Sequence, residues 1–389
     1  MNFLVPYLVR WNSLNRSRYY QIFNYLAQHG HQVHILQPPL LKSSDTGFSE
    51  TEQSCHPNIH LHEIAINSPF WKYDLPFNKI IKKGHYCLKI NKSIEKFISE
   101  FNIDAIFFYN MVLHPLSKID NVVTIYDLGD DHIDLLNHEL GAFSNPLILS
   151  YASNLLRKTL TNCDLVFSVS HYLTEKYYNN SIYLPNGATL EEVHPGSGHD
   201  FRDEYQGPVI GFVGSLEYFI NFDHLLEAAA VLRDCTFVIA GGGREYDGII
   251  EKKQKLGLDN LILTGGLPHQ QILQRIDSFD ICLNLFKKSP LTDGACPIKL
   301  FEYMAFKKPI ISSRISEVMR IDDDFFYWAD TADELISRVQ EILADKAATD
   351  NRVAREHDLL KKTYTWPRIS EAFLNDVKQT VEQKHARNC

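Results

Sequence analysis

Short runs of consecutive apolar residues recur along the chain, and most of them are followed by a stretch with helical spacing of apolar positions. A continuous apolar run of roughly four to eight residues is typical of a strand buried on both faces. The pattern therefore predicts parallel strands that alternate with helices, which is the arrangement of doubly wound α/β sheets. The predicted strands are Asn2–Val9, Gln32–Leu36, Ala105–Tyr109, Val122–Tyr126, Leu165–Ser168 and Ser181–Leu184 in the first half, and Val209–Val213, Thr236–Ala240, Leu261–Thr264, Ile281–Leu285 and Pro309–Ser312 in the second.

The alternation is interrupted by a stretch rich in turn residues, LPNGATLEEVHPGSGHD at residues 184–200, before a new apolar run begins at Pro208. We place a linker near Pro185–Gly207. The pattern thus predicts two Rossmann-like domains, residues 1–190 and 205–363, that face each other across a cleft. A C-terminal segment, residues 364–389, contains an amphipathic helix. Sheets of this kind bind ligands outside the carboxyl ends of their strands.

Composition narrows the class of protein. With 389 residues, 44% hydrophobic and 22% charged, the chain is expected to fold as two globular domains. Its net charge of −9 argues against general nucleic-acid binding. The seven cysteines show no CxxC pair and no zinc-ligand spacing, which is typical of a reducing cytosol. The N-terminal stretch resembles a first strand more than a signal peptide, and no apolar run is long enough to predict a membrane-spanning helix.

The segment Ser289–Ile311 carries the first candidate chemistry. It predicts a polar loop, a short helix that begins near Pro297, and a strand. Lys299 and Glu302 share one face near the N-terminus of that helix, where backbone N–H groups favour phosphate oxygens. Glu302 adds an acceptor for ribose hydroxyls, so the segment suits a nucleotide. Taken alone, this segment is explained better as an ordinary amphipathic helix with solvated charges than as a nucleotide site. The other segments of the chain favour the nucleotide site.

Several segments, in the correct order, resemble those of nucleotide-sugar-dependent glycosyltransferases of the GT-B fold. The resemblance covers nearly the whole chain, and it implies an acceptor-binding first domain, a donor-binding second domain and a last helix that returns to the first. The phrases PLTDGACPIKLFEYMA and TIYDLGDDH resemble most the subgroup that builds bacterial surface polysaccharides on lipid carriers, which includes the glucuronosyltransferase of xanthan assembly. The matching segments are YLAQHGHQVHIL at 25–36, FSVSHYLTEKY and IYLPNGATLEEVHP within 167–195, GFVGSL at 211–216, FVIAGGG at 237–243, LILTGGLPHQQILQRIDSFDICLNLF at 261–286 and CPIKLFEYMAFKKPII at 296–311.

In such an enzyme the second domain must hold a nucleoside diphosphate and stabilise it as it leaves. Glycines at strand ends let phosphate approach the backbone, although tight turns alone would also require them. We expect Lys299 to neutralise the leaving diphosphate. Many relatives carry two glutamates eight positions apart, and the first of these positions is Gly294 here, which leaves retaining or inverting transfer open and makes Asp293 the candidate substitute. The expected donor-binding residues are Gly214, Ser215, Gly241, Gly242, Gly265, Gly266, Leu267, Asp293, Pro297, Ile298, Lys299 and Glu302.

The first domain must supply any general base. Asp127, Asp130 and Asp131 follow a predicted strand, and clustered carboxylates raise the pKa of one member into the range of a base. We place Asp130 ahead of Asp127, with His132 as an orienting neighbour. The alternative is that Asp130 or Asp131 caps a helix.

Basic residues of the first domain are candidates for acceptor contact. Arg16 and Arg18 follow the first strand, with a solvated helix start as the alternative that we favour for Arg18. Lys82 and Lys83 belong to the lysine-rich stretch Asn78–Phe97, which suits an anionic membrane or a lipid diphosphate unless it is an ordinary solvated helix face.

The sequence therefore predicts a cytoplasmic glycosyltransferase, at the inner face of the plasma membrane, that moves a sugar from a UDP-sugar to a saccharide or lipid-linked saccharide. The nucleotide-sugar is a substrate, and no cofactor or obligatory metal is expected. Asp322–Asp324 is interpreted as a solvated turn, because it lies far from any phosphate loop. The rivals are a nucleotide-sugar epimerase of the same fold and a non-catalytic GT-B partner protein.

Overall fold

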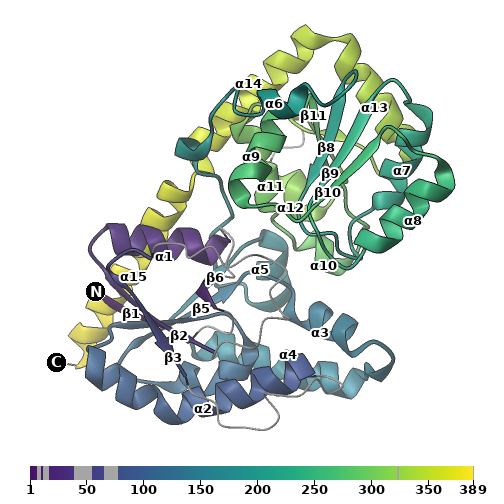
Figure 1. Ribbon diagram of the computed structural model, residues 1–389. Helices are drawn as coiled ribbons and strands as arrows, with labels where there is room; N and C mark the ends of the chain where they lie inside the picture. The colour runs from purple at the N-terminus through teal and green to yellow at the C-terminus, as the bar shows by residue number, and fades with distance from the viewer. Residues whose placement is uncertain (7–9, 12–16, 39–54, 65–77, 322–323, 389) are drawn as a thin grey trace. The chain divides into compact units, whose positions relative to one another are not determined.

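The computed structural model describes residues 1–6, 10–11, 17–38, 55–64, 78–321 and 324–388. Two compact units make up the chain, residues 1–184 with 370–389 and residues 185–369 (Figure 1). Each unit holds one parallel sheet whose strands are connected by helices. The prediction of two doubly wound α/β sheets is therefore confirmed.

The first unit contains a seven-stranded sheet in the order β3-β2-β1-β4-β5-β6-β7, parallel throughout. Its helices are α1 (Arg18–Gln28), α2 (Asn78–Phe101), the 3-10 helix η3 (Met111–Lys118), α3 (His132–Leu140), the 3-10 turn η4 (Gly141–Phe143), α4 (Pro146–Asn162) and α5 (His171–Tyr177). The strands are β1 (Asn2–Val5), β2 (Gln32–Gln37), β3 (Ile59–Glu63), β4 (Ala105–Phe108), β5 (Val123–Leu128), β6 (Leu165–Ser168) and β7 (Ile182–Tyr183).

The second unit contains a six-stranded parallel sheet in the order β10-β9-β8-β11-β12-β13. The strands are β8 (Val209–Val213), β9 (Thr236–Ala240), β10 (Leu261–Gly265), β11 (Ile281–Asn284), β12 (Ile310–Ser312) and β13 (Tyr327–Trp328). The helices are η5 (Leu190–Glu192), α6 (His199–Arg202), α7 (Phe222–Val231), α8 (Tyr246–Leu256), α9 (His269–Ser278), α10 (Pro290–Asp293), α11 (Ile298–Ala305), α12 (Ser316–Ile321), α13 (Ala332–Ala344) and α14 (Lys346–Thr363).

The last helix, α15 (Trp366–Asn388), begins in the second unit and ends in the first. Its Phe373 ring packs against Phe107 of β4 and Phe167 of β6, with centroids 5.8 and 5.0 Å apart. Its Lys384 ammonium donates to the Val122 carbonyl and to the Asp164 carboxylate. Helix α15 therefore contributes Phe373 to the core of the first unit.

The central strands lie where the apolar runs predict them, and the predicted bounds of β6, β8 and β9 match the structure residue for residue. The sequence pattern missed β3 and β13, each of which is an edge strand of its sheet. Histidines alternate with apolar residues in β3 (IHLHE), and β13 is two residues long, so neither strand forms an apolar run.

Candidate functional site

Glycine loops at the carboxyl ends of β8 and β9 in the second unit are joined by backbone hydrogen bonds. The Gly214 N–H donates to the Ala240 carbonyl, and the Leu216 N–H donates to the Gly242 carbonyl, both at 3.0 Å. A Cβ atom at Gly241, where φ is +155°, would lie 1.9 Å from the Gly214 carbonyl oxygen. The turn geometry alone therefore requires glycine at position 241, as the alternative interpretation held.

A third glycine loop follows β10 and lies beside the second. Gly265 has a φ of +71° and forms an isolated bridge with Gly241, and a Cβ at Gly242 would lie 3.5 Å from the Gly266 nitrogen. The structure thus brings together the predicted loops at Gly214, Gly241 and Gly265. The neighbouring Ser215 and Gly266 are exposed, while Leu267 is half-buried.

Helix α11 is held by apolar packing and by contacts at its N-terminal end. Pro297 is its N-cap and Ile298 its first residue, close to the predicted start. The buried Tyr303 hydroxyl accepts from the Val213 N–H at 3.0 Å, which ties the helix to β8. The Asn186 amide donates to the Cys296 carbonyl at 2.6 Å, so a residue of the predicted linker fixes the loop before the helix.

Lys299 projects from the first turn of α11 toward the Gly214 loop. Its ammonium nitrogen lies 3.9 Å from the centroid of the Phe212 ring, and a Cβ at Gly214 would lie 3.5 Å from it. The side chain keeps some solvent contact, but protein atoms surround it closely and this burial lowers its pKa to about 7, against the attraction of Glu302. Burial also raises the pKa of Glu302, while His269 and Lys299 lower it. A diphosphate would find here a cation with no ion-pair partner among the described residues.

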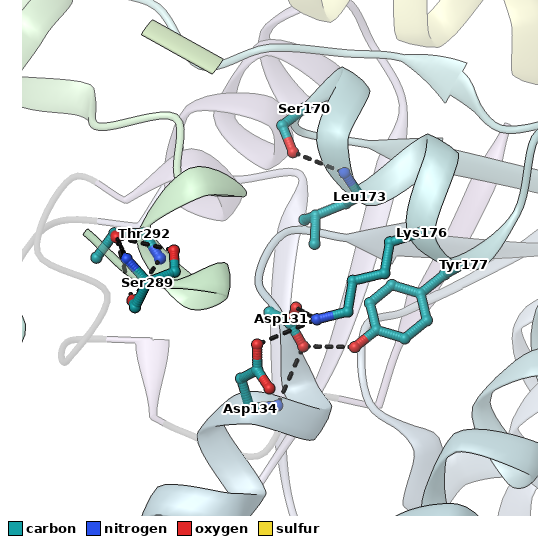
Figure 2. Close-up of polar contacts among 8 residues, drawn as sticks. All are labelled: Asp131, Asp134, Ser170, Leu173, Lys176, Tyr177, Ser289 and Thr292. Atoms are coloured by element: carbon teal, nitrogen blue, oxygen red, sulfur yellow. Dashed lines mark hydrogen bonds and ion pairs between the residues drawn. The ribbon is translucent and has the colours of Figure 1, made fainter. Parts of the chain in front are cut away.

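Asp293 has a role in the fold that the sequence does not reveal. Its Oδ1 accepts from the Ser316 N–H at 2.9 Å and from the Ser316 hydroxyl at 2.8 Å, which anchors the start of α12. In the preceding turn, Ser289 and Thr292 form the capping box of α10 (Figure 2). Contact between Asp293 and a donor sugar stays a prediction.

In the first unit, Arg18 and Asp127 form a buried ion pair. The Arg18 Nε donates to Asp127 Oδ2 at 2.9 Å and its Nη2 donates to Asp127 Oδ1 at 2.8 Å. The side chains are 6% and 0% exposed. The interpretation of Arg18 as a solvated helix start is therefore wrong, and this pairing favours a structural role over acceptor contact for Arg18 and over proton transfer for Asp127.

Asp131 is held by a network that sequence reasoning missed. Its carboxylate accepts from the Tyr177 hydroxyl and the Lys176 ammonium, both at 2.5 Å, and from the Asp134 N–H at 3.1 Å (Figure 2). The last of these contacts caps α3, as the alternative interpretation proposed. Lys176 and Tyr177 both belong to α5, more than 40 residues after Asp131, and nothing in the local sequence indicates that they pair with it.

Asp130 differs from its two neighbouring carboxylates because it is exposed. Partial desolvation by the surrounding protein, together with the charges of Asp127 and Asp131, raises its pKa to about 6 against the effect of Arg18. A carboxylate with such a pKa is suited to accept a proton near neutral pH. His132 lies edge-on to the Tyr126 ring, with centroids 6.4 Å apart.

The remaining acceptor candidates lie on α2 or outside the described residues. Arg16 and the side chain of Lys83 lie outside the described residues, whereas Lys82 is half-buried on α2. Asp322, which belongs to the predicted solvated turn, also lies outside them. Between residues 1 and 388, gaps excepted, no group of three or more metal-ligating side chains comes together. No helix within the same ranges is long and apolar enough to cross a membrane.

Comparisons with known proteins find similarity to glycosyltransferases. Residues 207–345 match the family model described as glycosyl transferases group 1. Among curated proteins, TuaH of Bacillus subtilis, which is assigned to teichuronic acid biosynthesis as a glycosyltransferase, is 26% identical over 184 residues. That match covers 46% of this chain and 45% of the relative, so it spans less than half the length of the curated protein.

Solved structures match over almost the entire chain. Sucrose-phosphate synthase from Thermosynechococcus elongatus has a TM-score of 0.75 at 15% identity, covering 97% of this chain and 99% of that one. HepE of Anabaena, in complex with UDP-glucose, has a TM-score of 0.71 at 13% identity, covering 97% of this chain and 100% of that one. At such low identity these likenesses show the fold, which is GT-B.

Proposed function

Because the chain has the GT-B fold and carries the domain of the group 1 glycosyl transferases at residues 207–345, we propose that it is a glycosyltransferase that uses a nucleoside-diphosphate sugar. The observation that carries this proposal is the position of Lys299, whose ammonium lies beside the Gly214 loop and over the Phe212 ring. Lys299 also lies in the first turn of α11, and the N-terminus of a helix favours phosphate oxygens.

In this proposal Lys299 neutralises the diphosphate while the bond to the sugar breaks, and Glu302, one turn later, accepts hydrogen bonds from the ribose hydroxyls. A UDP-sugar is the proposed donor, since HepE, a protein of the same fold, is described in complex with UDP-glucose. The backbone at Gly265, Gly266 and Leu267 is proposed to meet the base. No metal is required by this scheme, because Lys299 and the helix N-terminus supply the positive charge.

The proposed acceptor is a saccharide or lipid-linked saccharide of a bacterial surface polymer, as the likeness to a protein of teichuronic acid biosynthesis suggests. We assign the role of general base to Asp130 for the case of inverting transfer, because it is the exposed member of its carboxylate cluster. The proposed place of action is the cytoplasmic face of the plasma membrane.

A thermal-shift measurement on the full chain tests the donor site. UDP, GDP, dTDP and ADP, with and without a sugar, are added in the absence of metal. A nucleotide at about 100 times its dissociation constant stabilises the folded state by about 2.7 kcal/mol, which raises the melting temperature by several degrees. We expect a shift with UDP, a smaller one for Glu302→Ala, and an unchanged one for the control Glu251→Ala on the exposed face of α8.

Turnover separates the proposed enzyme from its rivals. Release of UDP that depends on an added saccharide or lipid-linked acceptor supports transfer. Conversion of the donor into another nucleotide-sugar without acceptor would identify an epimerase. The absence of any nucleotide shift in the wild-type chain would instead favour a non-catalytic partner protein.

A further inference from the structure

The amino ends of three neighbouring strands in the second unit border a cavity of about 530 Å³, which is within the size range of small-molecule sites. Pro208, Asp280 and Pro309 line this cavity, and each directly precedes a strand, namely β8, β11 and β12. We call it the basal cavity. Gly214 follows β8, a strand of five residues and therefore about 16 Å long, so the basal cavity and the Gly214 loop lie at opposite ends of the sheet.

The floor of the basal cavity is mostly apolar and its rim is cationic. Phe279, Ile342 and Val353 line the floor and are buried, and Leu343 of α13 adds an apolar side chain that is 42% exposed. Figure 1 shows α6 and α14 near the same end of the second sheet, and both contribute to the lining. The four cations of the lining are Arg202 of α6, Lys307 and Lys308 after α11, and Lys346 at the start of α14.

The two carboxylates of the lining are already engaged. Asp280 accepts from the Val209 N–H at 2.7 Å, and its carboxylate lies 3.5 Å from the Arg202 guanidinium. The Asp350 carboxylate lies 3.2 Å from the Lys346 ammonium, and both of these side chains are exposed. Four cations thus line the cavity against two carboxylates, in a chain whose net charge is −9. The basal cavity therefore has a local excess of positive charge.

The two lysines after α11 account for this excess. The Lys308 ammonium donates to the Asp277 carbonyl at 2.7 Å, and this neutral acceptor leaves the lysine charge in place. Lys307 is exposed and, within the ranges that the structure describes, has no ion-pair partner. The basal cavity therefore offers two uncompensated cations to an anion.

Lys307 is also held in a backbone conformation that lysine rarely adopts. Its φ is +53°, in the left-handed region that favours glycine. It follows the C-cap of α11, where its N–H donates to the Met304 carbonyl and the Lys308 N–H donates to the Tyr303 carbonyl. Helix α8 ends with the same pair of hydrogen bonds, and the equivalent residue there is Gly257.

The position of Lys307 needs a reason beyond the helix. The C-terminus of a helix favours nearby cations, which explains why a lysine follows α11. Lys308, one residue later, supplies that charge without a left-handed backbone. A strained residue that persists where glycine would fit is typical of a functional site. We therefore assign the Lys307 side chain to a ligand of the basal cavity.

We propose that the basal cavity binds a phosphate monoester, whose phosphate group lies among the four cations and whose organic part lies against the apolar floor. Such a phosphate carries a charge of about −1.5 to −2 at pH 7, which matches the two uncompensated cations. A carboxylate would neutralise only one of them. The inference goes beyond the proposed function, because this second site does not require glycosyl transfer.

Titration calorimetry of the full chain with phenyl phosphate tests the proposal, because this probe joins a phosphate group to an apolar ring. Inorganic phosphate is titrated in parallel, which separates an ester from the free ion. The cavity variant is Lys307→Gly, and the matched control is Lys255→Gln, which removes the charge of an exposed lysine of α8. Because glycine fits the left-handed backbone better than lysine, Lys307→Gly should be at least as stable as the wild type in chemical denaturation.

We expect the wild type and the control to bind phenyl phosphate and Lys307→Gly to bind it about tenfold more weakly, because a charge-assisted contact is lost. Addition of Lys346→Gln to this variant should weaken binding further. Inorganic phosphate should bind the wild type more weakly than the ester does. No binding by the wild type, equal binding by Lys307→Gly, or equal affinity for the ester and the free ion would each overturn the proposal.

A second titration, in the presence of UDP, separates the basal cavity from the donor site. Saturating UDP and the variant Lys299→Met should each leave the affinity for phenyl phosphate unchanged, because Lys299 lies beside the Gly214 loop at the other end of the sheet. Displacement of phenyl phosphate by UDP, or its loss in Lys299→Met, would place the probe at the donor site and overturn the proposal. Binding of phenyl phosphate that depends on Lys307, in a chain that does not bind UDP, would support the basal cavity and reject the proposed donor site.

Discussion

Each unit places a cation near the carboxyl end of its parallel sheet, and the two cations are used in different ways. In the first unit, Arg18 is buried and donates two hydrogen bonds to Asp127, near the end of β5. In the second unit, Lys299 lies over the Phe212 ring and has a carboxylate, Glu302, one helical turn away. The first charge is neutralised inside the protein, whereas the second remains available to an anionic ligand.

The same contrast holds among the three carboxylates that follow β5. Asp127 is paired with Arg18, and Asp131 is held by Lys176, Tyr177 and the start of α3. Both contribute to the fold. Asp130 lies between these anchored residues and is exposed, with a pKa raised to about 6. Two members of this cluster of carboxylates are thus fixed by partners in the fold, and they hold the third, Asp130, in an exposed position between them.

Removal of Arg18 should give the largest effect. Arg18→Ala leaves the Asp127 carboxylate buried without its partner, and breaking such a pair costs about 3–5 kcal/mol of unfolding free energy. The measurement is chemical denaturation of the variant beside the wild type. Arg157→Ala, an exposed arginine of α4, is the control and should change stability by less than about 0.5 kcal/mol.

The double variant Arg18→Ala with Asp127→Ala sharpens this result. Because it removes both charges, it should be more stable than Arg18→Ala alone. If Arg18→Ala is no less stable than the control, the pair does not hold the fold together, and the contrast between the two cations fails.

The sheets could be predicted from the sequence because their central strands are buried on both faces and are therefore continuously apolar. The structure keeps this pattern in β8 and β9, which are buried at every position. The strands β3 and β13 could not be predicted in this way. The strand β3 is only partly buried and alternates in polarity, and β13 has too few residues to form a pattern.

Of the candidate site, the sequence predicted the local parts and missed the distant ones. The α11 segment could be interpreted because Lys299, Glu302 and the helix start lie within a few residues of one another. Arg18 and Asp127 are 109 residues apart, and Asn186 and Cys296 are 110 apart. Such pairs depend on the order of strands in the sheet, which apolar periodicity does not encode.

The second prediction tests whether Asp130 is the working carboxylate of its cluster. A base must be deprotonated to act, so kcat/KM should rise with pH through about 6 and then level off. Asp130→Asn should lower kcat by about a thousandfold and abolish that rise. Asp127→Asn should instead lower stability and leave the rise in place. Normal turnover by Asp130→Asn would reject an inverting base here and favour retaining transfer, which needs none.

The third prediction concerns Lys299, the cation that remains available to a ligand. Lys299→Met should lower kcat about a hundredfold. In the free protein, burial lowers the pKa of Lys299 to about 7, so at a pH above 7 the amine is mostly neutral. A bound diphosphate favours the charged form and raises that pKa. Binding of UDP should therefore take up protons above pH 7, and affinity should fall as pH rises further.

Titration calorimetry in two buffers with different protonation enthalpies measures this uptake. The observed heats should differ between the buffers for the wild type and for Lys255→Met, an exposed lysine of α8, and should agree for Lys299→Met. Proton uptake that persists in Lys299→Met would assign it to another group. Lys299 would then already be charged in the free protein or would not contact the diphosphate, and the loss of kcat in Lys299→Met separates these two cases, because only a cation that contacts the diphosphate stabilises it as it leaves.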